Sequence, residues 1–213
     1  MRLFILIMLC FTTQFSFAQT DNFQGKLVYK VSMEGTSDDK NFNQAMIEKL
    51  KERAGNIDSV TVFIKDKYFR SETQGSEIVH WFQYVPSEQL VYEHLTKNDY
   101  IFIYSLDNEL LTVNENDFVI TNDSTISTIN GLVCRSYTID MNFGKTTYYY
   151  SDSLRSNSSI LERKHTTNFL RTYEHREFIP VKTVMTTPFF IIKYELVNME
   201  LYDVPMTIFS YLK

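Results

Sequence analysis

Glycine is scarce in this chain, and its six glycines stand far apart. They are Gly25, Gly35, Gly55, Gly75, Gly131 and Gly144, so no two lie closer than ten residues. A dinucleotide-binding turn, a phosphate-binding P-loop and the nucleophile elbow of a hydrolase each need glycines about two to five residues apart. The sequence therefore excludes these three classes of site.

Two fragments resemble catalytic motifs but lack the residues that would complete them. Ser37 and Lys40 fit the Ser-x-x-Lys of penicillin-recognising enzymes, yet no Ser-Asp-Asn or Lys-Thr-Gly accompanies them. Residues 144–146 (GKT) repeat the end of a P-loop, but Ile139 occupies the position of its first glycine. The first fragment therefore predicts a helix cap and the second a turn.

Metal ligands are also few. The residues that could supply a nitrogen or sulfur ligand to a metal are His80, His94, His165, His175, Cys10 and Cys134. No His-Glu-x-x-His occurs, and no two histidines have the spacing that presents both imidazoles to one metal. We therefore predict no metal, no cofactor and no catalytic residue, and expect that the protein is not an enzyme.

The apolar run at the N-terminus is too short to span a membrane. It covers residues 3–11, whereas a helix needs about 20 apolar residues to cross a hydrocarbon core of roughly 30 Å. Arg2 precedes the run, and the small residues Ser16 and Ala18 follow it, which is the pattern of a secretory signal peptide. We predict that residues 1–18 are this signal and that the mature chain has no transmembrane segment.

The alternative to cleavage is a lipoprotein signal that acylates Cys10. Leu9 is bulky where such a signal has a small residue, so we favour cleavage before Gln19. The expected location is therefore periplasmic or extracellular. Residues 19–213 are expected to form a single β-rich domain, because β domains of this length commonly stay undivided.

Charge and cysteine content narrow the set of partners. The formal net charge is −5, and loss of Arg2 with the signal makes the mature chain more acidic, so we predict no nucleic-acid partner. Cys134 is alone once Cys10 has left, which excludes an intramolecular disulfide. For Cys134 we favour an inert buried thiol over a nucleophile or an intermolecular bridge.

The mature chain begins with a strand pattern and continues with a helix pattern. Apolar residues alternate with polar ones along residues 23–33, as in a half-buried strand. They then recur at helical spacing over residues 42–54, and Gly55 follows in the position of a helix C′ residue. These patterns predict one strand and one amphipathic helix.

Strand patterns dominate the rest of the sequence. The predicted strands cover residues 60–64, 68–72, 77–84, 90–95, 99–104, 118–121, 132–139, 146–151, 181–187 and 190–201. In the last of them the apolar phase changes between Leu196 and Val197, which predicts a β-bulge. A capping box at residues 159–162 predicts a second helix near residues 160–174.

Aromatic residues are abundant, with 17 Phe, 14 Tyr and one Trp. They either pack a closed core or line a cavity that has an apolar floor and hydroxyl-tipped walls. In the second case the lining would include strand residues and the apolar face of the helix. The candidate lining residues are Leu27, Tyr29, Val31, Phe42, Met46, Leu50 and Trp81.

Several short segments together resemble a family of bacterial envelope proteins. The segments are residues 23–29 (FQGKLVY), 64–72 (IKDKYFRSE), 129–137 (INGLVCRSY), 146–152 (TTYYYSD), 179–182 (IPVK) and 204–211 (VPMTIFSY). The architecture of this family resembles that of the periplasmic lipoprotein carriers of the LolA/LolB type. The resemblance implies an incomplete β-barrel around helices, and it carries over no catalytic residue.

The sequence thus predicts a mainly β protein. Its expected fold is a curved antiparallel sheet, an open or half barrel, with one or two helices against the concave side. The helix face of Phe42, Met46 and Leu50 is expected to cover Leu27, Tyr29 and Val31. The leading hypothesis for function is non-catalytic binding or shuttling of an apolar ligand, such as a lipid or a lipoprotein acyl chain. The alternative is a structural or interaction module of the cell envelope with a packed aromatic core.

Overall fold

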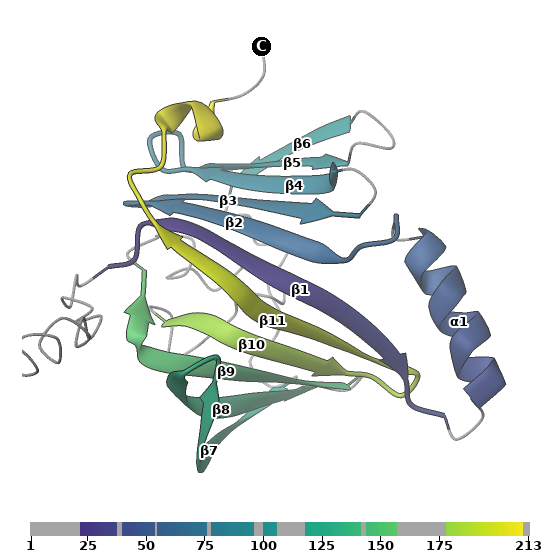
Figure 1. The fold of residues 1–213 in the computed structure, drawn as a ribbon. Coiled ribbons are helices and arrows are strands. Elements are labelled where there is room, and N and C mark those ends of the chain that lie inside the picture. The colour runs from purple at the N-terminus through teal and green to yellow at the C-terminus, as the bar shows by residue number, and fades with distance from the viewer. Residues whose placement is uncertain are drawn as a thin grey trace, which may run out of the picture.

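The computed structural model describes residues 22–37, 40–53, 55–75, 78–95, 100–105, 118–141, 144–156 and 178–210. Within them, eleven antiparallel strands form one open sheet in the order β6-β5-β4-β3-β2-β1-β11-β10-β9-β8-β7 (Figure 1). The strands are β1 (Gly25–Gly35), β2 (Ser59–Lys65), β3 (Tyr68–Gln74), β4 (Ile78–Val85), β5 (Leu90–Leu95), β6 (Tyr100–Ser105), β7 (Phe118–Ile129), β8 (Leu132–Met141), β9 (Gly144–Arg155), β10 (Phe178–Thr186) and β11 (Phe190–Leu201). The predicted fold class, a mainly β protein with an antiparallel sheet and few helices, is confirmed.

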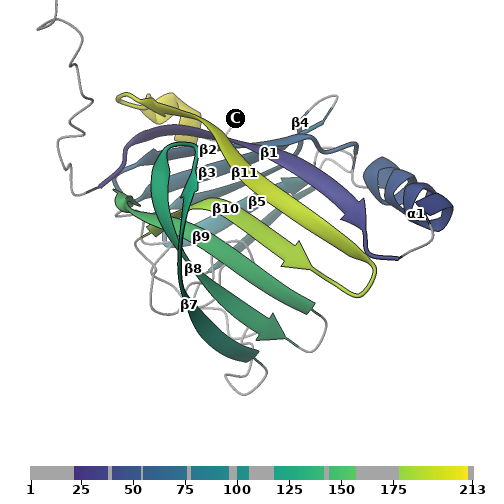
Figure 2. The ribbon, with the colours of Figure 1, turned by 60° about the horizontal axis from the view of Figure 1, so that its bottom comes forward.

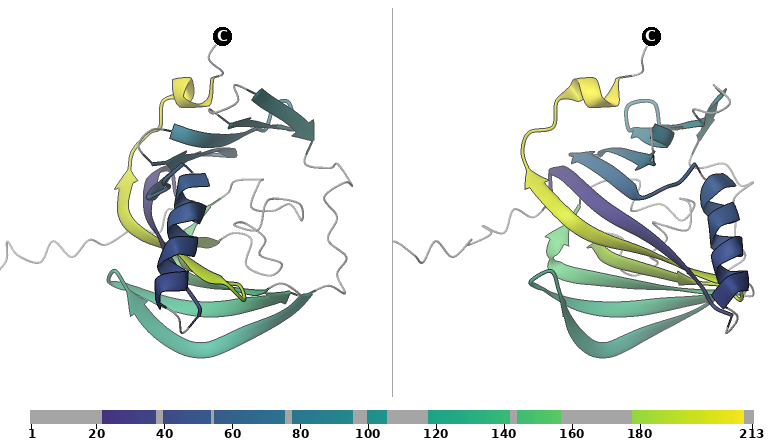
Figure 3. Two further views of the ribbon diagram at one scale, coloured as in Figure 1. Left: turned by 90° about the vertical axis from the view of Figure 1, so that its right-hand side faces the viewer. Right: turned by 45° about the vertical axis from the view of Figure 1, so that its right-hand side comes forward.

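The sheet consists of two meanders that meet at its centre. β1 to β6 follow one another outward to one edge, and β7 to β11 return from the other edge until β11 pairs with β1. We call β1–β6 the first wing and β7–β11 the second wing. Figures 2 and 3 show that both wings bend toward the same side, so the sheet has a concave and a convex face.

Strand register assigns the core to the concave face. Residues paired across antiparallel strands share a face, and Tyr29 pairs with Val60 on one side and Leu196 on the other. The hydroxyl of Tyr29 donates a hydrogen bond of 2.8 Å to the carbonyl of Pro180 on β10, beyond β11. The main core is made of Phe23, Leu27, Tyr29, Val60, Val62, Ile64, Phe69, Phe82, Tyr84, Val91, Cys134, Leu154, Ile179, Val181 and Leu196. It therefore joins residues of both wings.

The predicted β-bulge lies where the apolar phase changes. Val28 pairs with Asn198 whereas Tyr29 pairs with Leu196, so Val197 is the extra residue of β11. Before the bulge, Leu196 points into the core, and after it Met199 pairs with Leu27 on the same face. The phase change in the sequence is therefore confirmed as a change of register.

The predicted helix is present, and its C-terminus has the predicted glycine. α1 spans Lys40–Arg53. Gly55 has a φ of 80°, and the amides of Gly55 and Asn56 donate to the carbonyls of Glu52 and Lys51 at 3.2 and 2.6 Å. This is the pair of hydrogen bonds of a Schellman motif with glycine at C′.

The position of α1 differs from the prediction. The helix lies beside the Gly35 end of β1 (Figures 1 and 3), where the side chain of Asn43 occupies the space that a Cβ on residue 35 would need. Phe42 is 55% exposed, and Ile47 is the buried apolar residue of the helix. The prediction that Phe42 covers Leu27 and Tyr29 is wrong, because a helix that packs through a polar side chain on a strand end does not reach the strand centre.

Strand β7 is much longer than the sequence pattern predicted. β7 runs from Phe118 to Ile129, although residues 122–125 are polar. A turn at Asn130 and Gly131, with φ values of 52° and 78°, returns the chain into β8. The hairpin therefore extends β7 beyond the apolar residues on which the prediction rested.

Some predictions fall outside the described residues. These are the signal peptide at residues 1–18 and the second helix near residues 160–174. Among the described helices, none is long and apolar enough to cross a membrane. The short helix η4 (Met206–Phe209) packs on the convex face of the first wing, where Val204 and Phe209 cover Phe63.

Candidate binding site on the concave face

Two rows of side chains cross the concave face from β1 over the second wing. Each row starts on β1 and continues over β11, β10, β9 and β8. We call them the tyrosine row and the methionine row. The tyrosine row is Val31, Tyr194, Thr183, Tyr148 and Tyr137, and the methionine row is Met33, Ile192, Met185, Thr146 and Ile139.

Each row contains a threonine whose hydroxyl has no hydrogen-bond partner. Thr183 is 2% exposed and Thr146 is 1% exposed, and neither Oγ1 atom has a hydrogen-bond partner among the described residues. A buried polar group left without a partner costs about 1–3 kcal/mol. Within the described part of the chain, two such hydroxyls on adjacent strands are therefore energetically unfavourable.

Aromatic residues flank Thr183 on both neighbouring strands. Thr183 pairs with Tyr148 and Tyr194, and the rings of Tyr137 and Tyr148 stack with centroids 5.0 Å apart and planes 17° apart. Burial raises the pKa of Tyr194, so its phenol keeps its proton at neutral pH. The rows thus combine apolar surface with neutral hydroxyl groups.

Neither row carries a charged side chain. Their ten residues are aromatic, aliphatic, methionine or threonine. A carboxylate or phosphate bound there would be desolvated without an opposite charge, which costs several kcal/mol. A neutral oxygen acceptor, such as an ester carbonyl, fits two threonine donors without this cost.

Three of the predicted lining residues lie on this face. Leu27, Tyr29 and Val31 alternate along β1 and share the concave side. Leu27 and Tyr29 are fully buried in the main core, and burial raises the pKa of Tyr29 well above its usual range. Val31 is half-buried and begins the tyrosine row. The prediction therefore placed these three residues on one face correctly, and Val31 is the one that belongs to the candidate site.

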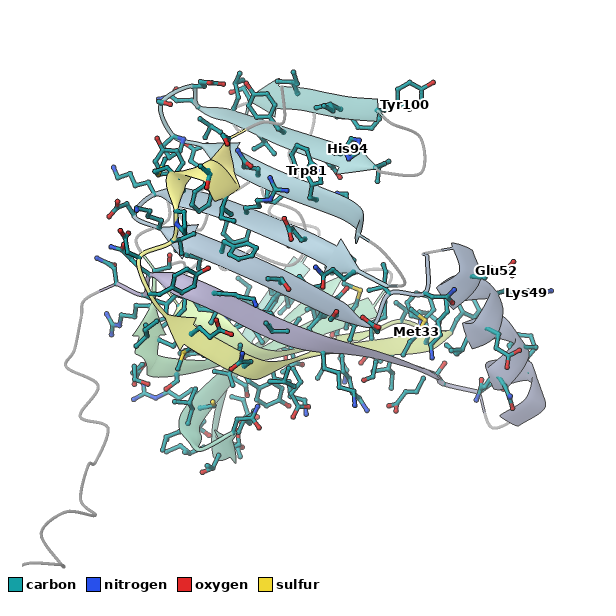
Figure 4. The ribbon with its side chains drawn as sticks, turned by 45° about the horizontal axis from the view of Figure 1, so that its top comes forward. Met33, Lys49, Glu52, Trp81, His94 and Tyr100 are labelled. Carbon is teal, nitrogen blue, oxygen red and sulfur yellow. The ribbon has the colours of Figure 1, made fainter. Side chains whose placement is uncertain are left out.

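Trp81 lies on the opposite face of the sheet. Its register runs through Glu72 and Thr61 to Val28, which alternates with Leu27. The guanidinium of Arg70 stands 4.8 Å from the centre of the Trp81 ring, and the His94 ring lies 5.4 Å away, as Figure 4 shows for the two labelled rings. The prediction that Trp81 lines the same face as Leu27 is therefore wrong. Alternation shows which residues of one strand share a face, but which face of a distant strand they share depends on turn lengths and strand register, which the sequence spacing does not fix.

The convex face around Trp81 holds the C-terminal segment in place. Arg70 donates to Glu72 at 2.7 Å, to the Gln83 side chain at 3.1 Å and to the Ile208 carbonyl at 3.2 Å. Gln83 is fully buried and donates to the carbonyl of Phe209 at 2.6 Å. These polar groups satisfy one another, so we assign this network to structure rather than to binding.

The remaining predicted lining residues lie on α1, and Cys134 lies in the main core. Met46 and Leu50 are half-buried on α1, at the Gly35 end of β1. Cys134 is buried in the main core, burial raises the pKa of its thiol, and its sulfur lies 3.4 Å from the Leu132 carbonyl. Among the described residues, no three His, Cys, Asp or Glu side chains form a group that could hold a metal ion.

Sequence reasoning missed Thr146 and Thr183. Their signal is the period of two that places Thr146 in phase with Tyr148, and Thr183 in phase with Val181 and Met185. The phase alone marks them as members of a buried face. That their hydroxyls lack partners depends on which strands pair, which no local pattern contains.

Comparison with known proteins gives little further information. No protein-family model matches the sequence, and no curated protein matches it. Among solved structures, that of PNGF-II in the C2 space group is similar to 86% of this chain, at 13% sequence identity and a TM-score of 0.42. The chain covers 30% of that protein's chain, and similarity at this level supports neither a shared activity nor a shared ligand. The resemblance to the LolA/LolB-type carriers stays a prediction.

Proposed function

We propose that this protein is an exported, non-catalytic carrier that binds a neutral amphiphile, such as an acyl ester of a lipid or lipoprotein, against the concave face of the second wing. The acyl chain lies on the apolar side chains of the two rows. The ester oxygens accept hydrogen bonds from Thr146 and Thr183. This proposal keeps the apolar ligand expected from the sequence and adds a polar group to it.

The observation that supports the proposal most is the pair of buried threonine hydroxyls without partners. Natural structures leave few buried polar groups unsatisfied, and each such group calls for an explanation. A ligand that accepts from both hydroxyls would offset their desolvation. The absence of charge in the rows agrees with a neutral acceptor.

The alternative function is a structural or interaction module of the envelope. The closed packing of Leu27 and Tyr29 in the main core favours it, since these two candidate residues leave no surface for a ligand. The two functions differ in one measurable property, which is saturable binding of an acyl chain by the mature protein.

Titration of the mature chain with a fluorescent fatty acid and with its methyl ester tests the proposal. We expect saturable binding, a stronger affinity for the ester than for the carboxylate, and an affinity that rises with chain length. Each buried methylene contributes up to about 0.8 kcal/mol, so two methylenes should strengthen binding by up to about tenfold. Binding that does not saturate, or that ignores chain length, would support the structural module.

Isosteric variants connect the binding to the two hydroxyls. Thr146→Val and Thr183→Val remove a hydroxyl at nearly constant volume, and the double variant should bind the ester about tenfold more weakly, as expected for two hydrogen bonds. Thr138→Val is the matched control, because the Thr138 hydroxyl already pairs with that of Thr147 at 2.8 Å on the same wing. Equal ester affinity in the double variant and the wild type would contradict the assigned role.

A further inference from the structure

The edge strand of the first wing is apolar and exposed on both faces. Residues 100–105 (YIFIYS) contain no charged residue and no proline. β6 pairs with β5 over its whole length without a register shift, and among the described strands no other pairs with it. The side chains of Tyr100, Ile101, Phe102 and Ile103 are 49% to 64% exposed, and Figure 4 shows Tyr100 at this margin of the sheet. A flat apolar edge of this kind accepts a further strand.

The edge of the second wing has the opposite character. β7 is polar over residues 121–125, and its pairing with β8 shifts between Asp123 and Ser127. Natural sheets protect their edges with charges and irregular strands of this type. Only one of the two described edges is therefore suited to strand addition.

We propose that two copies of this chain associate through their β6 strands, antiparallel and about a two-fold axis at Phe102. The sequence of residues 100–104 is the same in both directions, Tyr-Ile-Phe-Ile-Tyr. Antiparallel pairing about the central residue then sets position 100 opposite position 104, and Phe102 opposite Phe102 of the second copy. A strand with this symmetry fits itself, and a two-fold contact requires such self-complementarity.

The faces of the strand also match in this arrangement. Phe102 pairs with Glu93, which pairs with Phe82, and these three residues lie on the concave side, whereas Ile101 and Ile103 lie on the convex side. Ile101 would then lie opposite Ile103 of the second copy, and aliphatic and aromatic cross-strand pairs stabilise antiparallel sheets. No charge in β6 opposes the pairing.

The geometry limits the assembly to two copies. Pairing uses the β6 edge of each molecule, and the outer edges of the joined sheet are then the two irregular β7 strands. A contact of six residues per copy is smaller than a standard protein interface. The expected dimer is therefore weak and depends on protein concentration. This inference is independent of the proposed function, since the candidate binding site lies on the second wing.

A charge-exchange experiment tests the two-fold contact. Sedimentation of the mature chain over a wide range of concentrations should show a monomer–dimer equilibrium. Phe102→Lys and Phe102→Glu each place like charges opposite one another, so each variant alone should dimerise more than about 100-fold more weakly. An equal mixture of the two variants should recover the dimer, because opposite charges then meet at the axis.

Two controls complete the experiment. Val119→Lys places the same charge at an exposed position of the β7 edge and should leave dimerisation unchanged. Circular dichroism should show that the two Phe102 variants keep the fold, because residue 102 is half exposed. A mature chain that stays monomeric, a dimer that persists in Phe102→Lys, or a mixture that does not recover the dimer would each overturn the proposal. Loss of acyl binding alone would not affect it.

Discussion

Both wings are built from antiparallel strand pairs, but their side chains are buried differently. On the first wing, residues 60–64 of β2 are buried without interruption, because Val62 faces the main core and Phe63 is covered by Val204 and Phe209. On the second wing, the concave side presents tyrosines and threonines, and strand positions such as Val133 are exposed. Strand β2 of the first wing is therefore packed on both faces, whereas strand β8 of the second wing keeps exposed positions.

Under the proposed function, this difference assigns stability to one part of the sheet and binding to the other. A strand that is buried on both faces is rich in apolar residues and tolerates few changes. The second wing keeps polar hydroxyls in its interior at a cost in stability, which is typical of a surface that meets a ligand. If this comparison holds, equal substitutions on the two wings must have unequal effects.

The largest effect is expected from a cavity in the first wing. Ile64→Ala removes a nearly fully buried side chain from the main core, and such changes cost about 2–5 kcal/mol. Val133→Ala on the second wing removes an exposed side chain and should change stability by less than about 0.5 kcal/mol. Urea unfolding of both variants measures the difference. Comparable losses at the two positions would show that the wings are packed alike.

The next effect concerns the polar network on the convex face. Arg70→Met leaves the largely buried Glu72 carboxylate and the Gln83 carbonyl oxygen without their donor, so we expect a loss of about 2 kcal/mol. Arg135→Met is the matched control, because the ion pair of Arg135 with Asp152 is exposed, and exposed pairs contribute about 0–1 kcal/mol. Thermal unfolding of the two variants separates a structural network from a surface ion pair.

The third prediction is that Thr→Val substitutions within the second wing change the stability of the protein in opposite directions. Thr183→Val and Thr146→Val remove hydroxyls without partners, so each should stabilise the ligand-free protein by up to about 1 kcal/mol. Thr138→Val removes a hydroxyl that is hydrogen-bonded to Thr147, so it should destabilise by about 1 kcal/mol. Thermal unfolding without ligand is the measurement. Destabilisation by all three substitutions would mean that the hydroxyls of Thr146 and Thr183 have partners.

Local patterns predicted most of the fold. Alternation gave the strands, the helical period and Gly55 gave α1, and the phase change at Val197 gave the bulge, since each depends on neighbours in the sequence. The side of the sheet on which Trp81 lies, the position of α1 and the unpartnered hydroxyls depend on pairing between distant segments. The pairing of β1 with β11, which joins the two wings, belongs to that second class.

The smallest effect is expected at the edge of the second wing, where polar contacts replace apolar packing. The carboxylate of Asp123 accepts a hydrogen bond of 2.9 Å from the Thr125 amide, at the point where the pairing of β7 and β8 shifts. This amide bond, together with bonds from the Thr125 and Ser136 side chains, holds the pKa of Asp123 below its usual value.

The sign of the resulting pH dependence follows from the direction of this shift. A carboxyl whose pKa is lower in the folded protein stabilises it above the unfolded pKa of about 3.9, and this contribution is lost as the pH falls through the folded pKa. Asp123→Asn keeps an acceptor oxygen but cannot titrate. The melting temperature of the wild type relative to Asp123→Asn should therefore be highest near pH 6 and fall below about pH 4. Because Asp123 is exposed, the change should be small, and a difference that stays constant between these pH values would mean that the Thr125 bond does not favour the ionised carboxylate.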